Sequence, residues 1–120
     1  MIQYARLCIL YQEYMDNDIY NNFANLFNIL SHPIRLQILD ELRCNDACVC
    51  HLQTLLGKPQ AYVSQQLKVL REANIVTDER DGMLVYYRLT NELVQHILED
   101  LLEAPDPKRK LPGCTCPKCQ

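Results

Sequence analysis

The chain has 120 residues, a formal net charge of −3, 48% hydrophobic residues and 22% charged residues. This length fits one domain, and the composition is typical of a globular protein and excludes a disordered one. No apolar run approaches the roughly 18 residues that a membrane span needs, so we expect no membrane partner. The first residues, MIQYARLCILYQEY, lack the cleavage site of a secretory signal. We therefore expect a cytoplasmic protein whose seven cysteines are mostly reduced thiols.

Two helices are predicted at the start of the chain. Residues 2–15 contain neither Pro nor Gly and place apolar side chains at three- and four-residue steps. The segment 16–18 interrupts this helix and offers caps for the next one. The second helix has one apolar face, formed by Ile19, Phe23, Leu26, Phe27 and Leu30.

Two shorter helices are predicted to follow. Pro33 suits the first turn of a helix that runs to Leu42, with the buried stripe Ile34, Ile38, Leu39 and Leu42. Asn45-Asp46 can stop this helix and cap the next. That next helix is expected to face inward through Val49, Leu52, Leu55 and Leu56, and the turn Gly57-Lys58-Pro59 ends it.

Two more helices enclose a predicted β-hairpin. The helix from Gln60 to about Asn74 has the core residues Val63, Leu67 and Leu70. The hydrophobic period then changes from about 3.6 to 2, which predicts two strands joined by a two-residue turn at Asp81-Gly82. Asn91 can cap a last helix that ends near Glu103. Residues 104–120 contain four prolines and three cysteines and are interpreted as a Cys-rich tail outside the core.

This order of elements predicts a mainly α fold with a β-hairpin wing, a winged helix–turn–helix. A recognition helix needs a buried stripe and an outer face of polar groups that reach base edges, and residues 58–71 provide both. The candidate DNA-binding residues on that helix are Gln60, Tyr62, Ser64, Gln65 and Lys68. Arg80, near the hairpin tip, can reach a phosphate or the minor groove. A winged domain used for protein contacts is the alternative.

Three segments carry a family resemblance: LSHPIRLQILDEL (30–42), QAYVSQQLKVLREANIV (60–76) and DERDGMLVYYRL (78–89). They resemble the arsenic-repressor-like (ArsR/SmtB) family of bacterial metal-responsive repressors over about residues 19–103. The resemblance implies a homodimer, joined mainly by its first and last helices, that binds a palindromic double-stranded DNA operator and releases it when metal binds. The DNA-binding and dimerisation domain is then 1–103, with 1–18 as an N-terminal helical extension.

Two cysteines match the thiols of family members that sense soft metals. The stretch DACVCHL resembles their ELCVCDL-like segment, so Cys48 and Cys50 occupy the two thiol positions. Gln53 stands where the arsenic-sensing version has a third thiol, and two sulfurs are too few for As(III) or Pb(II). The missing donors can come from Cys44 or from the tail, whose three cysteines can instead form a second site of their own. The candidate metal ligands are therefore Cys44, Cys48, Cys50, Cys114, Cys116 and Cys119.

The expected inducer is a soft metal or metalloid ion. As(III), Cd(II) and Pb(II) are the favoured ions, with Zn(II) as a further candidate, because thiolates prefer soft ions. The family's zinc, cobalt or nickel site on the last helix is expected to be absent, because Asn91 and Leu93 stand where its Asp and His should be. Thiol redox or persulfide sensing by a repressor of the same fold is the alternative. An enzyme is not expected, since no βαβ setting surrounds any cysteine.

Overall fold

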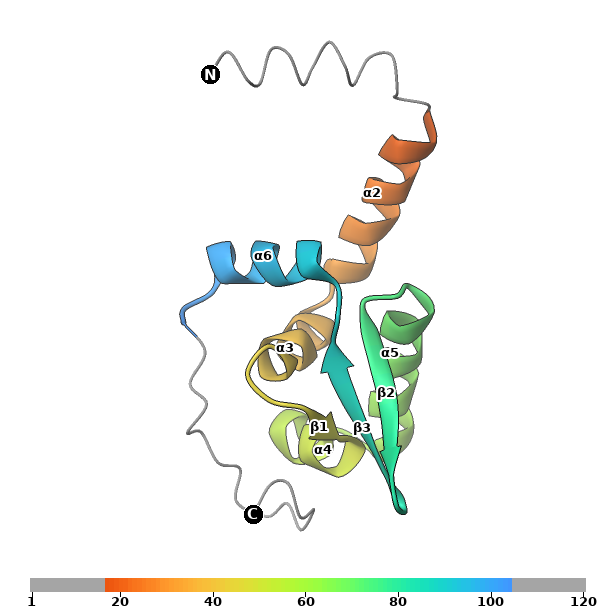
Figure 1. Cartoon of the computed structure of the whole chain (residues 1–120), viewed down its shortest axis with the longest axis vertical. Helices are drawn as coiled ribbons and strands as arrows, with labels where there is room; N and C mark the ends of the chain where they lie inside the picture. The colour runs from red at the N-terminus through yellow and green to blue at the C-terminus, as the bar shows by residue number, and fades with distance from the viewer. Residues whose placement is uncertain (1–16, 105–120) are drawn as a thin grey trace.

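The computed structural model describes residues 17–104, which form five helices and three strands (Figure 1). The helices are α2 (Asn17–Leu30), α3 (Pro33–Leu42), α4 (Val49–Leu56), α5 (Gln60–Glu72) and α6 (Glu92–Leu101). The strands are β1 (Ala47–Cys48), β2 (Val76–Asp81) and β3 (Leu84–Leu89). The predicted helix over 2–15 and almost all of the Cys-rich tail lie outside the described residues. None of the helices within 17–104 is long and apolar enough to cross a membrane.

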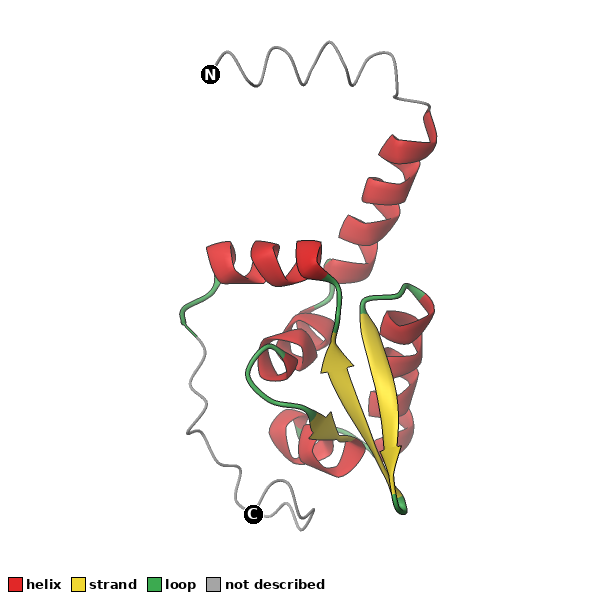
Figure 2. Ribbon diagram, viewed as in Figure 1, coloured by secondary structure: helices red, strands yellow, loops and turns green. Residues whose placement is uncertain are grey.

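The strands form one antiparallel sheet in the order β1–β3–β2. In Figure 2 the β2–β3 hairpin projects past α4 and α5 as a wing. Helices α4 and α5 pack against each other, and α3 packs on both of them. The predicted winged helix–turn–helix is therefore confirmed, because the helical pair and the wing have the order and the packing that this fold requires.

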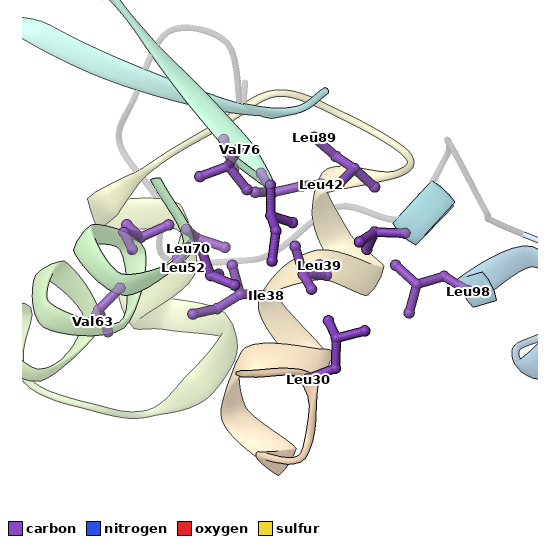
Figure 3. Close-up of a cluster of buried hydrophobic side chains, with 14 residues drawn as sticks. Leu30, Ile38, Leu39, Leu42, Leu52, Val63, Leu70, Val76, Leu89 and Leu98 are labelled. Carbon is purple, nitrogen blue, oxygen red and sulfur yellow. The ribbon is translucent and has the colours of Figure 1, made fainter. Parts of the chain in front are cut away.

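The core lies between α3, α4, α5 and the sheet (Figure 3). The recognition-helix stripe Val63, Leu67 and Leu70 is completely buried, as its spacing predicted. Side chains from the other elements complete the cluster, among them Ile38, Leu39, Leu52, Ile75 and Val94. This packing fixes the inner side of α5, so its opposite side must face solvent.

Local signals placed most helix ends correctly. Pro33 lies in the first turn of α3, and the Asn91 side chain accepts a hydrogen bond from the Val94 backbone N–H at the start of α6. Gly57 ends α4 with φ of 63°, a left-handed conformation that glycine adopts without steric cost. Helices α5 and α6 each end about two residues earlier than the sequence predicted, which is the usual uncertainty at fraying ends.

Two sequence predictions about local structure are wrong. The hairpin turn consists of Gly82-Met83 rather than Asp81-Gly82, because Asp81 still pairs with Leu84. Gly82, with φ of 63°, takes the first central position, the one that a type II′ turn reserves for glycine. Asn45-Asp46 does not cap α4, because the chain first forms the short strand β1 beside β3, and Cys48 becomes the cap.

The outer helices bury less of their apolar surface than the inner ones. Helix α2 was expected to have one apolar face, yet its Phe23 and Phe27 side chains are 43% and 58% exposed. On α6, Leu101 is 72% exposed, although Val94 and Leu98 are buried. Both helices lie at the end of the molecule opposite the wing tip (Figure 1). Within residues 17–104, apolar surface of α2 and α6 is therefore left uncovered at that end.

Candidate DNA-binding face and thiol site

The outer side of α5 presents the predicted polar residues. Gln60, Gln65 and Lys68 are exposed, while Tyr62 and Ser64 are half-buried. The Lys58 ammonium lies 5.9 Å from the centre of the Tyr62 ring, a cation–π contact at the start of the helix. This face combines amide, hydroxyl and ammonium groups, which suit base edges and phosphates.

The charges near this face divide into two groups. Arg71 forms an ion pair with Asp78 at 3.2 Å, and Arg88 one with Asp46 at 2.7 Å. The hydrogen bonds that Arg88 donates to the Asp46 carboxylate raise the pKa of Arg88. Lys68 and Arg80 form no ion pair within the described residues, and both are exposed. They are therefore the cations of α5 and the wing that remain available to an external phosphate.

A partly buried contact connects the recognition helix to α3 and α2. Arg35, on α3, donates from Nε to Gln66 Oε1 at 2.8 Å. The same guanidinium donates from Nη1 to the carbonyl of Ile29, near the end of α2, at 3.2 Å. Arg35 thus links α2 to the inner side of α5, so a displacement of α2 can be transmitted to the recognition helix.

Cys48 and Cys50 meet at the N-terminus of α4. Their sulfur atoms lie 2.6 Å apart, in a thiol–thiol contact in which either atom can donate. Cys48 is 2% exposed and caps the helix, with its Sγ accepting the His51 backbone N–H at 3.4 Å. Cys50 is half-buried on the first turn. A helix N-terminus favours negative charge, so this position suits thiolates.

The thiol site is joined to the wing through the sheet. Cys48 lies opposite Tyr86 of β3, and these two residues form a small buried cluster of their own. Cys50 and Leu84 pack against that cluster. Strand β3 is one half of the wing, and α4 packs directly on α5. A change at Cys48 is therefore next to β3, which pairs with the strand that carries Arg80, and next to α4, which packs on the recognition helix.

Cys44 is half-buried in the connection after α3, where its Sγ donates to the Asp40 carbonyl at 3.7 Å. Within residues 17–104 no three or more His, Cys, Asp or Glu side chains gather as they would around a metal ion. Cys48 and Cys50 can therefore provide two ligands of a soft ion but not a complete set of this kind. The tail thiols Cys114, Cys116 and Cys119 lie outside the described residues.

A buried polar pair lies beside the thiols. His51 Nε2 is 2.8 Å from Glu41 Oε1, and the two residues are 7% and 4% exposed. Glu41 belongs to α3, so the pair connects α3 to the first turn of α4. His51 is therefore buried inside the domain rather than exposed on the surface of α4.

Sequence reasoning missed the polar contacts inside the domain. Glu41 follows Ile34 by seven residues and so falls on the inward stripe of α3, a signal that could have marked it as buried. Gln66 carries a similar signal, because it follows Val63 by three residues and precedes Leu70 by four. Arg35 carries none, because a polar residue at the edge of a helical stripe is usually solvated.

Comparisons with known proteins agree with this fold. A family model described as bacterial regulatory protein, arsR family, matches residues 32–78. The HTH-type transcriptional repressor SmtB of Mycobacterium tuberculosis is 40% identical over 83 residues, which are 69% of this chain and 62% of that protein. The chain thus spans less than two thirds of the length of that relative.

Two further relatives match over a larger share of their own length. The arsenical resistance operon repressor of Staphylococcus xylosus is 30% identical over 99 residues, which are 81% of this chain and 90% of that protein. The crystal structure of the transcriptional repressor BigR from Xylella fastidiosa superposes with a TM-score of 0.61 at 34% identity, covering 75% of this chain and 99% of that one.

Proposed function

Because the chain belongs to the arsR family of bacterial regulatory proteins, we propose that it is a DNA-binding transcriptional repressor that releases its operator when Cys48 and Cys50 hold a soft ion. One observation carries this proposal. The two sulfur atoms meet at the start of α4, the helix that supports the recognition helix. As(III), Cd(II) and Pb(II) are the proposed inducers, and Zn(II) is a further candidate.

The proposed DNA contact uses α5 and the wing together. Gln60 and Gln65 read base edges, and Lys68 and Arg80 approach phosphates, because these four side chains are exposed on α5 and β2. Tyr62 and Ser64 lie on the same helix and are proposed to position it on the backbone. A palindromic operator fits two such helices about 34 Å apart, one turn of DNA.

The proposed assembly is a homodimer. The exposed aromatic residues of α2 and the exposed leucines of α6 lie at one end of the domain, away from the wing. Covering them with a second copy removes apolar surface from water and leaves both recognition helices accessible. Two copies also enlarge the thin core that a chain of this size can build.

Release follows from the position of Cys48. Its Sγ accepts the His51 backbone N–H and its backbone pairs with β3, so reorienting this side chain changes the cap of α4. A soft ion supplies bonds that draw both thiolates into one arrangement. A coupling free energy of about 1–3 kcal/mol weakens operator binding by about 5- to 150-fold, and DNA weakens ion binding equally. The thiols must lose protons, so ion affinity falls as pH falls.

Additional ligands are needed for most of the proposed ions. A tetrahedral zinc or cadmium site takes four donors, and Cys48 and Cys50 provide two. We propose Cys44 and the tail thiols Cys114, Cys116 and Cys119 as the remaining sources. Cys44 would have to exchange its contact with the Asp40 carbonyl for the ion.

Operator release under reducing conditions tests the proposal. Fluorescence anisotropy of a labelled operator is measured while As(III), Cd(II), Pb(II) or Zn(II) is added to the reduced protein. We expect at least one ion to weaken the complex at least fivefold. The double variant Cys48→Ser, Cys50→Ser should remain bound, whereas Cys8→Ser, which also removes a thiol, should respond like the original chain.

Two outcomes would contradict the proposal. One is a double variant that still dissociates at the same ion concentration. The other is an original complex that survives every saturating ion and dissociates only after oxidation. Intact-protein mass spectrometry identifies that second case, because a disulfide removes two protons while an ion adds its own mass.

A further inference from the structure

A cavity of about 290 Å³ lies between the start of α4, the start of α5 and the wing tip. Its lining includes Cys48 and Cys50 at the start of α4 and Met83 at the tip of the wing. Three sulfur-containing side chains from two separate elements therefore border one space. Gln60, a candidate DNA-binding residue, lines the same cavity.

We propose that the Met83 thioether is a third ligand for an ion held by Cys48 and Cys50, and that these three donors let the site take Cu(I) or the chemically similar Ag(I), in addition to the ions that need Cys44 or the tail thiols. This inference rests on the thiol site of the proposed function and adds the wing to it. Two thiolates and one thioether are soft donors that select Cu(I). As(III) and Pb(II) prefer three thiolates instead, and zinc needs a fourth ligand.

Packing does not explain the presence of Met83 at the wing tip. Its side chain is 100% exposed, so it contributes no burial to the described part of the chain. The position follows Gly82 in a two-residue turn, where a polar residue would serve equally well. Methionine is flexible, with three rotatable bonds, so its sulfur can turn into the adjacent cavity while the hairpin keeps its register.

Ligation by Met83 would connect ion binding directly to the DNA-binding wing. Arg80 pairs with Val85, and Val85 also lines the cavity. Holding Met83 against the start of α4 therefore draws in the tip of the hairpin that carries Arg80. Filling the cavity also confines Gln60 at the start of the recognition helix. Both changes disfavour the arrangement that the proposed operator contact requires.

Methionine-methyl NMR tests the ligand assignment without relying on DNA release. The chain has three methionines, Met1, Met15 and Met83. One equivalent of Ag(I) is added to reduced, oxygen-free protein labelled with ¹³C at the methionine methyl groups. We expect the Met83 signal to shift while the other two stay in place. Met83→Leu, which keeps an apolar side chain but lacks sulfur, assigns the signal.

Affinity measurements separate this inference from the proposed function. Cu(I) is titrated against a colorimetric chelator in the full chain with Cys114, Cys116 and Cys119 changed to Ser, so that the tail thiols do not compete. Met83→Leu should weaken Cu(I) binding at least tenfold. As a single substitution, Met83→Leu should change the affinity for the operator, measured in the absence of any ion, by less than twofold. The reason is that leucine preserves any apolar contact with DNA.

The other possible results of these measurements distinguish failure of the Met83 assignment from failure of the thiol sensor. If Cys48→Ser, Cys50→Ser abolishes Cu(I) binding while Met83→Leu leaves the affinity and the methyl signal unchanged, the thioether assignment is wrong and the thiol sensor stands. If neither variant changes binding of any soft ion, both proposals are overturned. A large loss of ion-free operator affinity in Met83→Leu would show instead that Met83 serves DNA contact.

Discussion

The inner and outer helices of this domain bury their apolar faces to very different degrees. Leu67 of α5 is completely buried, whereas Phe27 of α2 is 58% exposed. Both residues lie on regular apolar stripes, so the stripes alone do not distinguish them. An apolar stripe therefore predicts the buried side of a helix only where another element of the same chain covers that stripe. We propose these uncovered stripes as the surface for a second copy.

The largest expected effect is a loss of stability caused by a substitution in α5, one of the inner helices. Leu67→Ala removes buried methyl groups between α5 and the core and should lower the free energy of unfolding by about 2–5 kcal/mol. Chemical denaturation at a fixed protein concentration measures this, because a dimer couples stability to concentration. A loss below about 1 kcal/mol would mean that the core around α5 is less closely packed than its complete burial indicates.

The next largest expected effect is a weaker dimer caused by a substitution in α2, one of the outer helices. Phe27→Ala should weaken the proposed dimer about 20- to 400-fold, because the side chain is 58% exposed. Burying that part gains about 0.9–1.7 kcal/mol, and a symmetric interface counts this residue twice. Analytical ultracentrifugation over a range of concentrations measures the dissociation constant. Asn21→Ala, on the opposite side of α2, is the matched control and should dimerise normally. Equal dissociation constants for both variants would place the dimer interface elsewhere.

The smallest of the three effects tests the polar link between α3 and α4. Glu41→Ala leaves the buried His51 ring without this partner and should cost about 1–3 kcal/mol of unfolding free energy. Glu41→Gln keeps an oxygen that can accept a hydrogen bond and should cost less. Thermal unfolding of the two variants side by side checks the order. Equal losses in the two variants would show that the charge of Glu41, rather than its hydrogen bond, stabilises the contact.

Much of the fold was predictable because its signals are local. Pro33 and Asn91 mark helix starts, Gly57 marks a helix end, and the spacing of Val63, Leu67 and Leu70 identifies the buried side of α5. A cap or a stripe involves residues within a few positions of one another. The polar outer face of α5 followed directly, since it is the side that the stripe leaves exposed.

The thiol site was predictable only in part. The family resemblance singled out Cys48 and Cys50, and the structure brings their sulfur atoms together. Their roles as ligands remain a proposal. Strand β1, which changes Cys48 from a helical residue into a cap, depends on pairing with residues about 40 positions later in the chain. Two residues are too few to give a strand pattern of their own.

The amino-acid sequence alone determined the order of helices, the hairpin and the side of α5 that faces outward, because neighbouring residues are enough to set caps, turns and periodicity. Only the tertiary structure decided which distant side chains meet. It buried Glu41 beside His51, linked Arg35 to Gln66 and placed Met83 at the rim of the cavity that contains the two thiols. These contacts join separate elements, and their geometry exists only after the core has packed.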